Sequence, residues 1–194
     1  MVISLRYAIL ICLVATTHVA ASPSVKRQDE TYQVTGSSAQ ELRQMIDRGG
    51  PVNSDDGKQY DGITKWSLTW DYQLKRRGKV WIVVSRSVLL DIKVVTPRWI
   101  DFQNAPGVLR TQWRIYRANL LRHEEGHVKI ALRAAYAVDK YLGTYGASSS
   151  LEKLKSDIQK NTRGLLRQYR KIDRSYDQRT RHGASQGASL AKGS

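Results

Sequence analysis

A metal-binding pattern inside one long amphipathic segment is the feature that most restricts how this chain can fold. Residues 123–127 read H-E-E-G-H, which fits H-E-x-x-H. Apolar residues recur at three- and four-residue spacing over 108–142, which predicts one long helix around the pattern. Residues at i and i+4 share a helix face, so His123 and His127 can reach one metal ion, with Glu124 beside them. The segment is therefore predicted to be a helix with one side open to a ligand.

This pattern in a helix is typical of zinc peptidases. Zinc in a catalytic site takes three protein ligands and leaves one position for water or substrate. Glu124 would act as the general base that takes a proton from the attacking water. Gly126 costs about 1 kcal/mol relative to alanine inside a helix, so we expect another backbone or a substrate to approach it closely. The alternative interpretation of the pattern is a solvated helix face that binds no metal.

The third metal ligand has three candidates. A metzincin continuation is excluded, because Ile130 and Arg133 stand where its glycine and histidine would be. We assign the third ligand to His182, which could fold back onto the motif helix and complete a three-histidine site. Asp177 and Glu152 are the alternatives, and Glu152 would correspond to the glutamate that a gluzincin takes from its following helix.

Two residues near His182 are assigned supporting roles. Asp177 would orient a ligand imidazole through its second nitrogen. Tyr176 would donate a hydrogen bond to the oxyanion that develops in the transition state. The region after the second long helix is therefore expected to complete the active site.

The first 21 residues read as a secretory signal peptide. Arg6 supplies a positive charge, residues 7–15 form a short apolar run, and residues 19–21 are a small-residue cleavage site. The run is too short to span a membrane, which takes about 20 apolar residues. We expect a secreted or periplasmic protein, cleaved near Ala21, with no transmembrane segment. Cys12 is the only cysteine and would be lost with the signal, which leaves no disulfide and no thiolate ligand.

The charge of the chain bears on its partners. The formal net charge is +15, which suggests attraction to acidic surfaces such as envelope polymers, although solubility alone would also explain it. No Cys/His finger or aromatic-basic signature indicates a specific nucleic-acid partner. We expect a monomer that acts on a peptide or protein substrate. The alternative function is a non-catalytic, zinc-stabilised, basic envelope or polyanion-binding protein.

The rest of the chain predicts a single α+β domain. Residues 22–30 read as a flexible leader, 31–188 as the domain and 189–194 as a mobile tail. In the second half of a predicted hairpin, apolar residues fall at even-numbered positions, with Arg86 as the exception. We expect an N-terminal antiparallel sheet packed on two long helices, the first of which carries the motif. The predicted strands are 31–35, 65–74 and 80–92, with a turn at 76–79, and the predicted helices are 39–48, 108–142 and 151–176.

Several further segments are similar to one protein family. They are Tyr32-Gln33-Val34-Thr35-Gly36, Thr64-Lys65-Trp66-Ser67-Leu68-Thr69-Trp70, Pro97-Arg98-Trp99, Leu120-Leu121-Arg122 before the motif, Tyr176-Asp177, Thr180, His182-Gly183 and Gln186-Gly187-Ala188. On these segments the chain resembles domain-of-unknown-function family 922, exported proteins regarded as zinc-dependent proteases. The resemblance covers about residues 31–190. It implies a zincin-type α+β fold and supplies no substrate.

Overall fold

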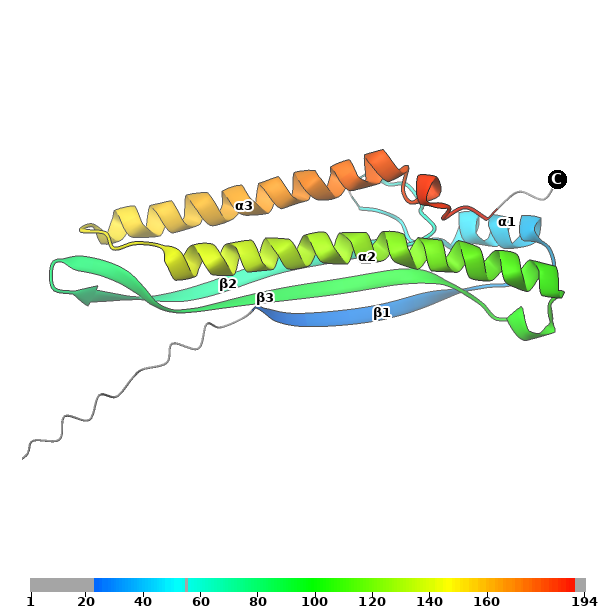
Figure 1. Cartoon of the computed structure of the whole chain (residues 1–194), viewed down its shortest axis with the longest axis horizontal. Coiled ribbons are helices and arrows are strands. Elements are labelled where there is room, and N and C mark those ends of the chain that lie inside the picture. The colour runs from blue at the N-terminus through cyan, green and yellow to red at the C-terminus, as the bar shows by residue number, and fades with distance from the viewer. Residues whose placement is uncertain (1–22, 55, 191–194) are drawn as a thin grey trace, which may run out of the picture.

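The computed structural model describes residues 23–54 and 56–190, so the predicted signal peptide lies outside the described residues. Two long helices lie on one side of a three-stranded sheet, which makes the fold a mixed α+β type (Figure 1). The elements are β1 (Ser24–Val34), α1 (Ala39–Gly49), β2 (Ile63–Arg77), β3 (Val80–Trp99), α2 (Gly107–Thr144) and α3 (Leu151–Thr180), with short 3-10 helices at Phe102–Asn104 and Ala184–Gln186.

Strands β2 and β3 form the long predicted hairpin. A two-residue turn joins them, and Gly78 adopts a φ of 59°, which favours glycine. The pairing register shifts between Gln73 and Leu74, so Val84 of β3 is an extra residue without a partner on β2. An extra residue exchanges the two faces to which the side chains of a strand point, so Trp81 and Val83 pack against the core. The predicted even-numbered phase is therefore wrong before the bulge and holds from Val88 onward.

Arg86 occupies a core-facing position just after this bulge. Its Nε donates to Asp139 Oδ1 of α2 at 2.8 Å, which satisfies a charge that would otherwise be costly to bury. Gly143 makes room for it, because a Cβ there would lie 2.5 Å from the Arg86 Cζ. The exception in the apolar pattern is thus a paired guanidinium between the sheet and α2.

Strand β1 corrects two predictions. Residues 24–30, expected to be part of a flexible leader, form most of this strand. It pairs with β3 in parallel, from Ser24 opposite Leu89 to Val34 opposite Trp99, so the sheet is mixed rather than antiparallel, with order β1-β3-β2. Its first eight residues are exposed. These residues are held by backbone hydrogen bonds at the edge of the sheet. Their sequence therefore lacks the apolar alternation from which a strand could have been predicted.

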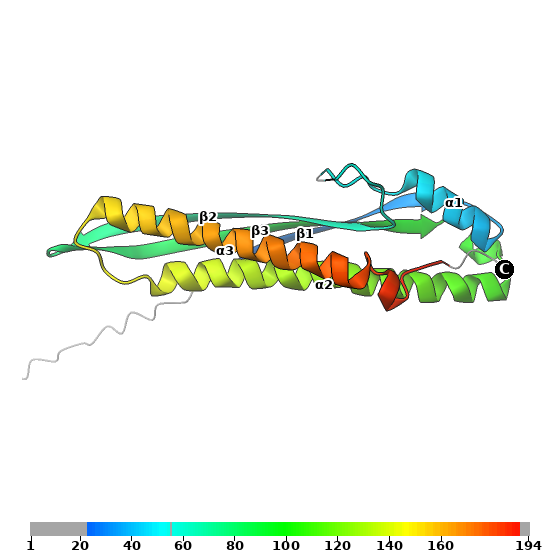
Figure 2. The ribbon, with the colours of Figure 1, turned by 90° about the horizontal axis from the view of Figure 1, so that it is seen from above.

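Helix α3 follows α2 through a short connection and runs back along it (Figure 2). The Ser150 side chain caps its first turn by accepting from the backbone N–H of Lys153. The helix continues to Thr180, four residues beyond its predicted end, which keeps Asp177 on a helix. Among the described residues, no helix combines the length and the apolar character that crossing a membrane requires.

Two hydrophobic clusters lie along α2, and the motif lies between them. The first joins the hairpin to α2 and the start of α3, and the second joins α1 and Trp99 to the first half of α2. Leu120 belongs to the second cluster and Val128 to the first. Leu190 also belongs to the second and is 3% exposed, so residues 189–190 are not part of a mobile tail. Residues 191–194 lie outside the described part of the chain.

Candidate metal site

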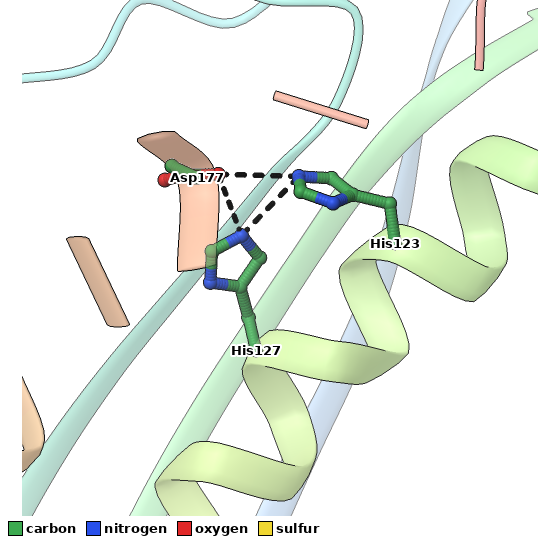
Figure 3. Close-up of side chains that lie close together, drawn as sticks. All are labelled: His123, His127 and Asp177. Atoms are coloured by element: carbon green, nitrogen blue, oxygen red, sulfur yellow. Dashed lines mark hydrogen bonds and ion pairs between the residues drawn. The ribbon is translucent and has the colours of Figure 1, made fainter. Parts of the chain in front are cut away.

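The two motif histidines and Asp177 point at one another (Figure 3). The Nε2 atoms of His123 and His127 are 3.3 Å apart. Asp177 Oδ1 lies 3.2 Å from Nε2 of His123 and 3.0 Å from Nε2 of His127. The histidines share a face of α2, one turn apart, and α3 presents the carboxylate from the opposite side. Within the described residues, these three side chains form a group that could hold a metal ion.

Hydrogen bonds fix the orientation of both rings. His123 Nδ1 lies 3.0 Å from the Gln186 side-chain oxygen, and His127 Nδ1 lies 2.7 Å from Asp173 Oδ1. With Nδ1–H donated outward, each neutral imidazole directs its Nε2 lone pair toward Asp177 Oδ1. Three electron-rich atoms about 3 Å apart repel unless a cation lies among them. The arrangement therefore calls for a proton or a metal ion at this point.

In the metal-free protein a proton can occupy this position. Burial lowers the pKa of His127, but its hydrogen bonds to Asp173 and Asp177 outweigh that effect and raise the pKa to about 10. Burial opposes ionisation of Asp177, yet hydrogen bonds from His123 and His127 bring its pKa below the ordinary value. Since metal ligands bind in their deprotonated forms, a metal ion would displace this proton.

Glu124 lies beside the group in a buried position. Its side chain is 3% exposed, and Thr64 at the start of β2 donates to its Oε2 at 2.7 Å. A Cβ at Gly62 would lie 2.9 Å from Oε1, so the glycine allows β2 to approach the carboxylate closely. Burial raises the pKa of Glu124. A carboxylate with a raised pKa is a better proton acceptor near neutral pH.

A partly buried network of hydrogen bonds holds the segment that leads into β2. Arg43 of α1 donates from both terminal nitrogens to Asp61, at 2.6 Å each. The Tyr116 hydroxyl of α2 donates to the same carboxylate at 2.9 Å, and Tyr32 of β1 donates to the Asp61 backbone carbonyl at 2.8 Å. Three elements thus fix Asp61, and Gly62 follows it directly against Glu124.

The candidate ligands and Glu124 line a cleft of about 710 Å³. Its walls come from residues 59–66, the motif face of α2, the end of α3 and residues 181–189. His123, Glu124, His127 and Asp177 all open into it. The candidate ligands and the buried carboxylate therefore lie in the wall of a cleft that a molecule could enter from solvent.

Gly126 has a different partner from the one expected. A Cβ there would lie 2.2 Å from the Tyr176 hydroxyl and 2.4 Å from its Cζ, so a tyrosine side chain, not a backbone or substrate, occupies the space. The Tyr176 ring stacks on His123 at 5.0 Å between centroids. Its hydroxyl donates to the His123 carbonyl and contacts the Gln186 side chain. Tyr176 therefore supports the His123 ring, and its hydroxyl, for which an oxyanion-donor role was predicted, is directed at the His123 carbonyl and the Gln186 side chain.

The structure does not place His182 or Glu152, two of the three candidates for the third ligand, in the metal group. Because α3 remains helical to Thr180, Asp177 faces α2, and His182 lies beyond the helix end with a φ of 51°. Its Nδ1 is 3.4 Å from Asp177 Oδ1, and its ring packs on Tyr60 at 4.4 Å. Asp177 thus takes the place expected of His182. Glu152 is ruled out as a ligand, because it lies in the first turn of α3, 25 residues and so about 37 Å along the helix from Asp177.

Sequence reasoning missed Asp173, Gln186 and Thr64. Asp173 could have been found from its spacing, because it lies four residues before Asp177 on the same helix, as His123 lies four residues before His127. Its other oxygen accepts from the Trp66 indole at 2.9 Å, so it is fixed on both sides. Gln186 and Thr64 carried no comparable spacing signal, because both reach the site from outside α2 and α3.

A family comparison agrees with the resemblance drawn from the motifs. The model of the family described as "Bacterial protein of unknown function (DUF922)" matches residues 29–183, most of the chain, including the motif and Asp177. No curated protein and no solved structure matches this chain. The chain belongs to the DUF922 family.

Proposed function

We propose that this chain is a secreted zinc-dependent peptidase with a zincin-like arrangement of its catalytic helix. The main support is that His123, His127 and Asp177 converge on one point, with Glu124 buried beside them in the wall of the same cleft. The ligands come from two helices, and hydrogen bonds orient both imidazoles. A merely structural cluster would not need a cleft at its side or a buried carboxylate next to it.

The spacing of the ligand atoms suits zinc. Zinc binds nitrogen and oxygen ligands at about 2.0–2.1 Å, so two ligands of a tetrahedral site are about 3.3 Å apart. The three separations here are 3.0, 3.2 and 3.3 Å. Two imidazoles and one carboxylate are also a known catalytic ligand set, which leaves the fourth position open.

Glu124 would carry the proton transfers of peptide hydrolysis. Zinc bound here would make water acidic enough to ionise near neutral pH and would polarise a carbonyl. Glu124 would accept the proton of the water whose oxygen attacks the carbonyl carbon, and would deliver it to the nitrogen as the C–N bond breaks. The hydroxyl of Thr64, 2.7 Å from Oε2, would hold the carboxylate in place. The site would thus use one residue as base and then acid.

Two neighbouring glutamates allow a matched test. Glu124→Gln removes the buried base, and Glu125→Gln makes the same change one residue on, at an exposed side chain paired with Arg27 at 2.9 Å. We expect E124Q to bind one zinc per chain and to lose hydrolysis of a peptide library by about 10²- to 10⁴-fold. E125Q should bind zinc and keep its activity. Metal analysis and mass-spectrometric digests measure both.

Three outcomes would separate the alternatives. Hydrolysis that a chelator abolishes and zinc restores supports the proposal. Zinc binding without hydrolysis in the wild type would favour a non-catalytic, zinc-stabilised envelope protein. Absence of bound zinc, or equal turnover by wild type and E124Q, would refute the peptidase assignment.

A further inference from the structure

A bound metal ion would make the metal-site cleft positive. The basic residues that line it are Arg43, Lys65, Arg170, Arg174 and Arg181, and the acidic residues are Asp61, Glu124, Asp173 and Asp177. The side chain of Lys65 lies on the other face of the sheet from Thr64 and Trp66, so four basic and four acidic side chains balance, and a bound divalent ion would leave an excess of two positive charges. A substrate that enters this cleft therefore meets a positive field.

The acidic side chains of the cleft are already engaged. Asp61 forms a two-pronged pair with Arg43, and Glu124 accepts from Thr64. Asp173 contacts His127 and Trp66, while Asp177 contacts the histidines. In the described part of the chain, none of these carboxylates lies within ion-pair distance of Arg174 or Arg181. The carboxylates of the cleft thus interact with residues of the protein itself.

Two of the basic side chains are available to a ligand. Arg174 and Arg181 are exposed, and no carboxylate in the described part of the chain lies within ion-pair distance of them. Arg174 lies near the end of α3, and Arg181 is the residue that follows its last turn. Lys65 is not available in this way, because Thr64 and Trp66 face the helices and the residue between them on β2 points to the opposite face of the sheet. Both arginines therefore border the cleft from the α3 side. Arg170 differs, because it is stacked on the Trp66 ring at 3.7 Å.

We infer that the cleft selects acidic peptides, with Arg174 and Arg181 contacting carboxylates near the bond that is cut. This inference rests on the proposed function and names its substrate class. Both arginines line the same cleft as the metal group, so they would act on substrate residues close to the reacting carbonyl. A guanidinium binds a carboxylate through two parallel hydrogen bonds, which suits the arginines to this discrimination.

The test compares two peptide pools that differ only in Glu or Gln at the randomised positions. One double variant is R174Q/R181Q. Its matched control is K171Q/R179Q, which removes the same charge from exposed residues of α3 that do not line the cleft. We expect the wild type to prefer the Glu pool in kcat/KM by roughly tenfold. R174Q/R181Q should lose this ratio, and the control should keep it.

A binding measurement separates this inference from the peptidase assignment. Zinc-loaded E124Q should bind a fluorescent Glu peptide more tightly than its Gln counterpart, and R174Q/R181Q in that background should remove the difference. If the wild type cleaves neither pool but this binding difference is found, the peptidase assignment fails and the charge selection stands. Equal treatment of Glu and Gln peptides, or a preference that K171Q/R179Q reduces as much as R174Q/R181Q, would overturn the inference.

Discussion

Gly126→Ala should weaken the fold by forcing the Tyr176 ring away from α2. The new Cβ would lie 2.2 Å from the hydroxyl, 2.4 Å from Cζ and 2.7 Å from Cε1. Carbon atoms pack at about 3.5 Å, so the ring must move by roughly 1.2 Å. Overpacking of this kind costs about 1–3 kcal/mol, and three close ring contacts place it near the upper end. The gain in helix propensity offsets about 1 kcal/mol.

The net loss is therefore about 2 kcal/mol, or a fall in Tm of about 4–8 °C for a chain of this size. Urea unfolding followed by far-UV circular dichroism, with chelator present, measures it without any contribution from metal. Gly164→Ala is the matched control, because Gly164 lies inside α3 with nothing within 4 Å of its would-be Cβ. G164A should stabilise the protein by up to about 1 kcal/mol.

Tyr176→Ala completes the cycle. In the Y176A background the clash is gone, so G126A should become stabilising by up to about 1 kcal/mol. In the wild-type background G126A should also weaken zinc binding, because the displaced ring stacks on His123. If G126A stabilises the otherwise unchanged protein as G164A does, Tyr176 does not pack on Gly126 and the reasoning is refuted.

Further predictions concern the ligands and the end of the chain. Asp177→Ala should abolish stoichiometric zinc binding while His182→Ala keeps it; the reverse result in metal analysis would restore His182 as the ligand. Asp173→Asn should weaken zinc binding by about 10- to 100-fold in a competition titration, because it removes the carboxylate that orients His127. With chelator present, the raised pKa of His127 contributes stability that is complete below pH 6.5 and is lost as the pH rises toward about 10. The Tm should therefore fall across that range, and H127N should flatten the dependence of Tm on pH. Zinc-loaded protein should show no such fall, since zinc replaces the proton. Leu190→Ala should cost about 2–4 kcal/mol in urea unfolding, and a negligible change would show that the segment is not packed.

The sequence predicted the elements whose pattern is local. The hairpin turn at Gly78, the start of α1 after Ser38 and the start of α3 after Ser150 all follow from residues close together in the chain. The long helix around the motif likewise follows from its three- and four-residue periodicity.

The sequence did not predict features that depend on distant partners. β1 is stabilised by pairing with a strand some 65 positions away, so its exposed, polar residues gave no signal. The bulge opposite Leu74 reversed the phase of β3 without a Gly or Pro to mark it. The third member of the metal group depended on where α3 ends, and an end predicted four residues early favoured His182 over Asp177. The signal peptide stays a prediction.

The parallel pairing of β1 predicts an order of folding. The hairpin can close early around its two-residue turn. β1 cannot pair until β3 and the intervening residues are in place, because Ser24 pairs with Leu89. An edge strand that joins last and is largely solvent-exposed should also be the first to detach. Its amides should therefore exchange with solvent faster than those of β3, while the ion pair of Arg27 with Glu125 links each such opening to α2.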